Sequence, residues 1–135
     1  MKDEAVRERI EHELAKASRA ADAATRNAAA ADYETAANRL YYAALHMAKA
    51  VLATEGLEPK SHRGVRQLLV VHFVADERLP EWAEPALARL ETERDLADYA
   101  AEFVTPQERY DKCRTEADRL MTALEEYLRS EGWIS

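Results

Sequence analysis

The amino-acid sequence predicts an all-α protein, an antiparallel up-and-down bundle of four main helices plus a shorter third helix. Two observations predict this fold. Glycine and proline, which interrupt helices, occur only between residues 56 and 106 and at residue 132, so two long segments contain neither. Alanine, the strongest helix former, is so common that hydrophobic residues reach 47%, although Leu, Ile, Val and Phe make up only 25 of 135.

Length, charge and cysteine content limit the class of protein. With 135 residues, the chain is expected to form one domain over residues 1–135. Its net charge of -7 opposes indiscriminate coating of nucleic acid, although a local basic patch could still bind phosphate. A single cysteine, Cys113, excludes an internal disulfide and a cysteine-rich zinc site. We find no apolar segment near the roughly 18 residues of a membrane span and no secretory segment, so we expect a cytoplasmic protein without membrane association.

The first two helices are expected over about residues 3–26 and 32–56, because apolar residues recur there every three or four positions. Asp32 is a favourable N-cap for the second helix, and Gly56 is suited to its C-terminal end. His46 has apolar neighbours on this helix, so we expect a hydrogen-bonded histidine in the core or at an interface.

The third and fifth helices have clear start signals. Ser61 is a favourable N-cap for the third helix. Residues 68–74 could form a strand on propensity alone, but the helical surroundings and the lack of a partner strand favour a helix. The fifth helix is expected to begin with a capping box over residues 105–108, with Pro106 at the first helical position. Cys113 lies on its apolar stripe and is expected to be a small buried side chain.

A charged residue interrupts the apolar stripe of the fourth helix, which is expected over about residues 81–104. At spacings of three and four, the stripe consists of Leu87, Leu90, Arg94, Ala97, Ala101 and Val104. Because burial of an unpaired guanidinium is very costly, Arg94 requires a counter-ion or a cleft. One interpretation is a structural ion pair between Arg94 and Asp98. The other is a phosphate or RNA site in which Asp95, Asp98 and Tyr99 support Arg94.

A basic cluster surrounds the start of the third helix. It consists of Lys60, His62, Arg63 and Arg66. Backbone N–H groups at a helix N-terminus also favour anions, so the cluster is a candidate site for a nucleotide or RNA. The alternative is an ordinary N-cap with solvated side chains. The sequence has no Glu-x-x-His pair, no two histidines four residues apart and no phosphate-binding loop, so we expect no metal and no cofactor.

Two adjacent tyrosines lie on the predicted second helix. The ring of Tyr41 or Tyr42 can pack inward while the other lies at the solvent boundary or meets a partner. Simple core packing is the interpretation we favour. Arg39, just before them, lies on the surface or approaches the same cleft as Arg94.

Three segments, taken in order, resemble the HEPN domain family. Residues 36–46, Ala-Ala-Asn-Arg-Leu-Tyr-Tyr-Ala-Ala-Leu-His, resemble the second-helix signature of that family. Residues 61–65, Ser-His-Arg-Gly-Val, resemble the start of its third helix, and residues 94–99, Arg-Asp-Leu-Ala-Asp-Tyr, its R-x-x-A-D-Y segment on the fourth. The resemblance covers nearly the whole chain.

The resemblance implies a bundle of four or five helices that commonly dimerises. Many members of the family are RNases, often toxins paired with a small nucleotidyltransferase antitoxin. They cut RNA without metal by means of an arginine, an adjacent polar residue and a histidine that four to six intervening residues separate from the arginine. Arg94 and Asp95 match the first two. The histidine has no counterpart, because Tyr99, Ala100 and Ala101 stand where it is expected.

Three hypotheses about function follow. The first is a HEPN module, related to toxin–antitoxin systems, that binds RNA, a nucleotide or a nucleotidyltransferase-type antitoxin and has a degenerate RNase motif. The second is an active, metal-independent RNase toxin that uses Arg94 with Asp98 and Tyr99, and the third is a structural helical oligomeriser. We predict a homodimer, because an alanine-rich core is thin and gains stability from further burial. Whether a partner enzyme modifies Tyr99 is left open.

Overall fold

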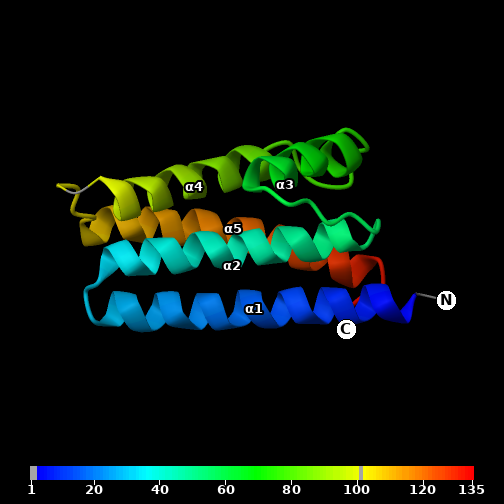
Figure 1. Ribbon diagram of the computed structural model, residues 1–135, viewed down its shortest axis with the longest axis horizontal. Helices are drawn as coiled ribbons and strands as arrows, with labels where there is room; N and C mark the ends of the chain where they lie inside the picture. The colour runs from blue at the N-terminus through cyan, green and yellow to red at the C-terminus, as the bar shows by residue number, and fades with distance from the viewer. Residues whose placement is uncertain (1–2, 101) are drawn as a thin grey trace.

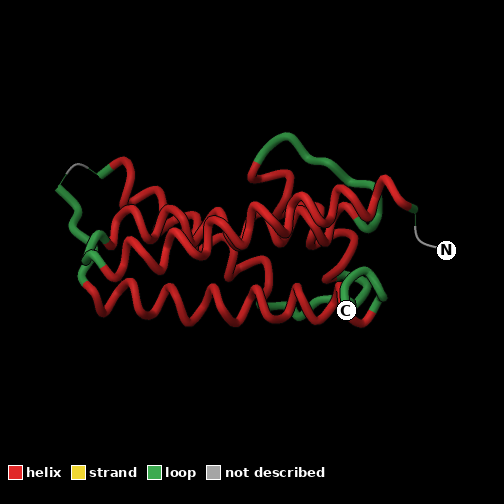
Figure 2. The backbone as a smooth tube through the Cα atoms, turned by 90° about the horizontal axis from the view of Figure 1, so that it is seen from below, coloured by secondary structure: helices red, strands yellow, loops and turns green. Residues whose placement is uncertain are grey.

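The computed structural model describes residues 3–100 and 102–135, which form an all-helical bundle (Figure 1). The elements are α1 (Glu4–Ala29), α2 (Tyr33–Ala53), α3 (His62–Leu69), the π-helical segment η1 (Val70–Val74), α4 (Ala83–Tyr99) and α5 (Gln107–Ser130). All the regular elements in Figure 2 are helical, which confirms the predicted fold class. None of the described helices is both long enough and apolar enough to cross a lipid bilayer.

Helix α2 is the centre of the bundle, because it packs against α1, α3, α4 and α5. Figure 1 shows α1 along one side of α2, α3 and α4 along the other, and α5 behind it. The α1–α2 turn and the α4–α5 loop lie at the same end of the molecule, so the four long helices run alternately up and down. Residues on α2 can therefore meet side chains from helices that are distant in the sequence.

Local signals in the sequence set several helix ends. The side chains of Asp32 and Ser61 each accept a hydrogen bond from the backbone N–H three residues further along, at 3.3 and 2.9 Å, which confirms both as N-caps. Beyond the end of α2, Gly56 adopts a left-handed φ of +72°, and backbone hydrogen bonds from it and the next residue close the last turn. Glycine suits this position because it has no Cβ to clash.

Helix α4 is shorter than the predicted range of residues 81–104. It ends at Tyr99, because Ala100 adopts an extended conformation with φ -95° and ψ 97°. Val104, which was expected on the apolar stripe, is 75% exposed. Ala101, the other outer member of that stripe, lies outside the described residues. The apolar repeat therefore predicted the existence of the helix correctly and its end wrongly.

The predicted capping box at the start of α5 is also wrong. Pro106 occupies the N-cap position instead of the first helical position, and no side-chain hydrogen bond caps the helix. Thr105 is buried, and its backbone N–H donates to Glu34 Oε2 of α2 at 2.7 Å. A hydrogen bond to a distant helix therefore replaces the local hydrogen bonds that a capping box would form.

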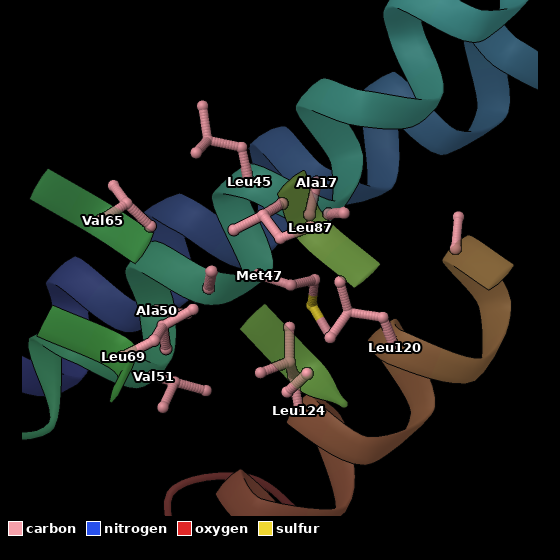
Figure 3. Packing of buried hydrophobic residues seen from close by; sticks show 14 of the residues in the cluster. Ala17, Leu45, Met47, Ala50, Val51, Val65, Leu69, Leu87, Leu120 and Leu124 are labelled. Carbon is pink, nitrogen blue, oxygen red and sulfur yellow. The ribbon is translucent and has the colours of Figure 1, made fainter. Parts of the chain in front are cut away.

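The core combines many alanines of α1 and α2 with larger apolar side chains from all the main helices. The fully or nearly buried alanines of α1 and α2 include Ala17, Ala20, Ala24, Ala37, Ala44 and Ala48. Figure 3 shows Met47 of α2 directed toward Leu120 of α5. Residues 68–74 are helical, as predicted, and they contribute Leu69 and Phe73 to the core.

Candidate functional site

Arg94 of α4 lies among three tyrosine rings. Its side chain is only 11% exposed, and Nη1 donates a hydrogen bond to Tyr42 Oη at 2.8 Å. The guanidinium carbon lies 5.3 Å from the ring centroid of Tyr41, 5.6 Å from that of Tyr42 and 5.8 Å from that of Tyr99. These are cation–π distances, so the rings stabilise the charge that the apolar stripe would otherwise leave unsupported. We call Arg94, Tyr41, Tyr42 and Tyr99 the Arg94 site.

Asp95 is the counter-ion of Arg94 within the described residues. Asp95 Oδ1 lies 2.7 Å from Arg94 Nη2, and the Asp95 side chain is 51% exposed. Arg94 Nε is buried and has no hydrogen-bond partner among the described residues. Burial by itself lowers the pKa of Arg94, but Tyr42 and Asp95 raise it above its ordinary value. The site therefore contains a permanent cation that is balanced by an exposed carboxylate.

The predicted ion pair between Arg94 and Asp98 is wrong. Asp98 Oδ2 instead accepts a hydrogen bond from Asn38 Nδ2 on α2 at 2.8 Å. Asn38 Oδ1 in turn accepts hydrogen bonds from Arg39, at 2.8 Å from Nε. Helical spacing placed Asp98 one turn from Arg94, but it could not reveal that a neighbouring helix offers Asp98 another partner.

The structure brings three of the four candidate catalytic residues together. Arg94, Asp95 and Tyr99 are in direct contact through the ion pair and the cation–π pair. Tyr99 is the last residue of α4 and is 74% exposed, so its hydroxyl is accessible. Asp98 belongs to the adjacent hydrogen-bond network of α2.

The basic cluster at the start of α3 reaches the Arg94 site through His62. The His62 ring lies against Tyr41 and Tyr42, with centroid separations of 5.5 and 5.9 Å. His62 Nδ1 is 3.6 Å from Glu91 Oε2, and Arg66 forms an ion pair with the same carboxylate. His62 is thus a neighbour of the Arg94 site that the linear motif could not indicate, because it comes from another helix.

The four residues of the basic cluster have different surroundings. His62 Nδ1 and the guanidinium of Arg66 face Glu91, so the charge of Arg66 is partly neutralised. Lys60 and Arg63 are exposed, and neither has an ion pair within the described part of the chain. The expectation of freely solvated side chains therefore fits only Lys60 and Arg63.

Tyr41 and Tyr42 divide the roles that their positions suggested. Tyr41 is 1% exposed, and burial together with the negative charge of Glu91 raises its pKa, so its hydroxyl stays neutral. Tyr42 is half-buried and carries the hydrogen bond to Arg94. Arg39 lies over the same Tyr42 ring, with its guanidinium carbon 5.1 Å from the ring centroid. One ring is in the core, and the other connects two arginines.

A buried acid–histidine pair on α1 and α2 was missed by the sequence analysis. Glu13 is 3% exposed, and its Oε2 lies 2.7 Å from His46 Nδ1. Burial opposes ionisation, but the hydrogen bond to His46 and the charges of His46, Lys49 and Arg9 lower the pKa of Glu13. Glu13 is a charged residue on the apolar stripe of α1, and a charge on an apolar stripe is also what singled out Arg94. The pair confirms the expected hydrogen-bonded role of His46.

The Arg94 site can bind an anion and can stack a planar ring. The guanidinium supplies a permanent positive charge, and the exposed Tyr99 ring supplies a stacking surface. We find no group of three or more potential metal ligands within residues 3–100 and 102–135.

The comparisons with known proteins agree with the fold and with the motifs. The model of the HEPN domain family matches residues 10–127. The chain is 33% identical over 99 residues to "Putative toxin MJ0605" from Methanocaldococcus jannaschii, and the alignment covers 71% of this chain and 74% of that protein. Because the family match includes α2, α3 and α4, which carry the three motifs, the chain belongs to the HEPN domain family.

Proposed function

We propose that this chain is a toxin-related HEPN module that binds RNA through the Arg94 site and has little nuclease activity of its own. The main support for this proposal is the environment of Arg94. Its side chain is only 11% exposed, donates a hydrogen bond to Tyr42 and forms an ion pair with the exposed Asp95. A phosphate can displace such a solvated counter-ion at small cost, whereas it could not displace a buried one.

The aromatic rings favour RNA over other anions as the ligand of the Arg94 site. Single-stranded RNA is recognised by base stacking on aromatic side chains combined with contacts to phosphates. Tyr99 presents an accessible ring 5.8 Å from the Arg94 guanidinium, so one nucleotide could use both groups. Lys60 and Arg63 are further exposed cations near the start of α3, on the His62 side of the site.

A binding titration with labelled single-stranded RNA tests this proposal. We expect Arg94→Ala to weaken binding by about tenfold, or about 1.4 kcal/mol. Arg89→Ala is the matched control, since Arg89 is on the same helix but is 59% exposed and pairs with Glu116 of α5. Arg94→Lys, which keeps the charge and loses the planar fork, should have intermediate affinity. Equal affinities for wild type and both Arg94 variants would contradict the proposal.

The partner and the oligomeric state are also part of this proposal. The relationship to a protein named as a toxin supports a nucleotidyltransferase-type antitoxin as partner, and the thin alanine-rich core supports a homodimer. Sedimentation at micromolar concentration should give twice the mass of the chain. A monomer under those conditions would contradict the homodimer, and it would leave the RNA titration as an independent test.

A metal-independent RNase is the second candidate, and the position of His62 favours it. The family histidine is missing after Arg94, but the His62 ring lies 5.9 Å from Tyr42, which bonds to Arg94. Histidine is the usual general acid or base near neutral pH. If this candidate is correct, RNA is cleaved in the presence of EDTA, and cleavage is lost in both Arg94→Ala and His62→Ala. If wild type leaves the RNA intact, the binding module is the better description.

A further inference from the structure

A hollow between α1 and α2 is lined largely by basic side chains. It has a volume of about 270 Å³, and its described lining comprises Lys16, Arg19, Ala20, Ala23, Arg39, Tyr42 and His46. Arg39, Tyr42 and His46 lie three and four residues apart, so they share one face of α2. The small side chains of Ala20 and Ala23 leave the space open on the α1 side. No carboxylate is among the described residues that line this hollow, which we call the α1–α2 hollow.

The basic side chains on the α1 side of the α1–α2 hollow have no counter-ion among the described residues. Neither Lys16 nor Arg19 has an ion pair or side-chain hydrogen bond within the described part of the chain. By contrast, Arg89 and Arg109 each contact a carboxylate within 3 Å. In a chain with a net charge of -7, two cations without a counter-ion that line a concave site indicate an anionic ligand.

Two of the lining groups are held in place by their neighbours. Glu13 lies behind His46 and contacts Nδ1 at 2.7 Å, so Nε2 is the ring nitrogen that is left for a ligand. Arg39 Nε donates to Asn38 Oδ1 at 2.8 Å, and the guanidinium lies over the Tyr42 ring. Side chains that are fixed before binding lose less conformational entropy when a ligand arrives.

Tyr42 connects the α1–α2 hollow to the Arg94 site. Its side chain lines the hollow, while its hydroxyl accepts the hydrogen bond from Arg94 Nη1 at 2.8 Å. Arg39 and Arg94 both lie near this ring, at 5.1 and 5.6 Å from its centroid. A strand that places one phosphate at Arg94 therefore needs only to pass Tyr42 to bring another phosphate to the hollow.

We propose that the α1–α2 hollow is a second phosphate site, which binds a phosphate of the same RNA strand that reaches Arg94. The binding groups are Lys16, Arg19, Arg39 and His46 Nε2. This inference rests on the proposed RNA-binding function and extends the interface from α4 across α2 to α1. It adds Lys16 and Arg19 of α1, which lie outside the segments that carry the family motifs, to the RNA interface.

The test uses a double variant on α1 and a control that removes the same charge elsewhere. Lys16→Ala/Arg19→Ala removes two cations that support no other described contact. Lys112→Ala/Arg129→Ala also removes one lysine and one arginine, from exposed positions on α5. RNA affinity is measured as a function of salt concentration. We expect the α1 variant to bind about tenfold more weakly and to show a log–log salt slope smaller by about 0.7, the value for one phosphate contact on a single strand.

A second measurement uses inorganic phosphate as the probe. Phosphate should shift the NMR signals of the His46 imidazole and of the backbone amides around residues 16, 19 and 39 in wild type. The same titration of Lys16→Ala/Arg19→Ala should leave them unchanged, and thermal melting checks that both double variants are folded. This arm reports on the hollow without any RNA.

The outcomes separate the inference from the function on which it rests. Equal RNA affinities and salt slopes for the two double variants would overturn the inference, whatever Arg94→Ala does. Phosphate shifts at His46 combined with equal RNA affinities would identify a small phosphorylated ligand, and this too would overturn the assignment to RNA. If Arg94→Ala binds RNA like wild type but the α1 variant does not, the proposed role of Arg94 fails and the phosphate site in the hollow is supported.

Discussion

Arg94 of α4 donates a hydrogen bond from Nη1 to the hydroxyl of Tyr42 on α2, at 2.8 Å, and joins two positions that are 52 residues apart. The contact determines how a charge can lie on the apolar side of α4. It gives the guanidinium a neutral acceptor and an aromatic surface, and it leaves Asp95 free to face solvent. The candidate site therefore forms only where α2 and α4 pack against each other.

Removal of the Tyr42 hydroxyl should weaken the fold. Tyr42→Phe keeps the ring but leaves Nη1 of a nearly buried Arg94 without its acceptor, which should cost about 1–3 kcal/mol. Thermal or urea unfolding measures the loss. Tyr33→Phe is the matched control, because the Tyr33 hydroxyl has no hydrogen bond within the described residues and its ring packs against Tyr110. Equal losses for the two variants would show that the bond to Arg94 contributes nothing.

Removal of the counter-ion should strengthen RNA binding. Asp95→Asn takes away the carboxylate that competes with phosphate for Arg94, and we expect affinity to rise about fivefold, or about 1 kcal/mol. Since Asp95 is 51% exposed, the free energy of unfolding should change by less than about 1 kcal/mol. Asp111→Asn on α5 is the control for net charge. A rise of the same size in that control would mean that only the overall charge matters.

The buried Glu13 should make stability depend on pH in the acid range. Because its folded-state pKa is below the ordinary value of 4.5, ionised Glu13 stabilises the fold above that value, and the contribution is lost as the pH falls through the lowered pKa. Glu13→Gln should cost about 1–3 kcal/mol at neutral pH, with the difference from wild type shrinking below about pH 4.5. Unfolding measured from pH 3 to pH 7 tests this.

The control for this experiment is Glu11→Gln, since Glu11 is exposed on the same helix. Its unfolding free energy should follow that of wild type at every pH. A difference between Glu13→Gln and wild type that grows toward acid pH would contradict the expected sign.

The turn between α1 and α2 offers a stabilising substitution. Ala31 has a left-handed φ of +61°, a conformation that costs a residue with a Cβ about 1–2 kcal/mol. Ala31→Gly should therefore stabilise the protein by about 1 kcal/mol after the entropy of glycine is counted, with a rise in Tm of about 4 °C. Ala30→Gly, at φ -90°, is the control and should lower Tm slightly. A lower Tm for Ala31→Gly would contradict the argument.

Sequence patterns predicted what depends on neighbours along the chain. The number and order of the main helices, the N-caps at Asp32 and Ser61, and the charge at Arg94 on an apolar stripe all follow from spacing of three and four residues or from a cap position. The end of α4 and the start of α5 were predicted less well, because Thr105 contacts Glu34 of a distant helix and local sequence signals do not include such a contact.

The sequence by itself determined an all-helical bundle of the HEPN family and identified Arg94 as its most unusual residue. Only the tertiary structure decided which side chains interact. Arg94 contacts Tyr42 and Asp95, Asp98 contacts Asn38, and His46 contacts Glu13. The physical reason is that helical periodicity fixes the face on which a side chain lies but not the distant helix that packs there. The groups of the proposed phosphate site come together only when α1 is packed against α2.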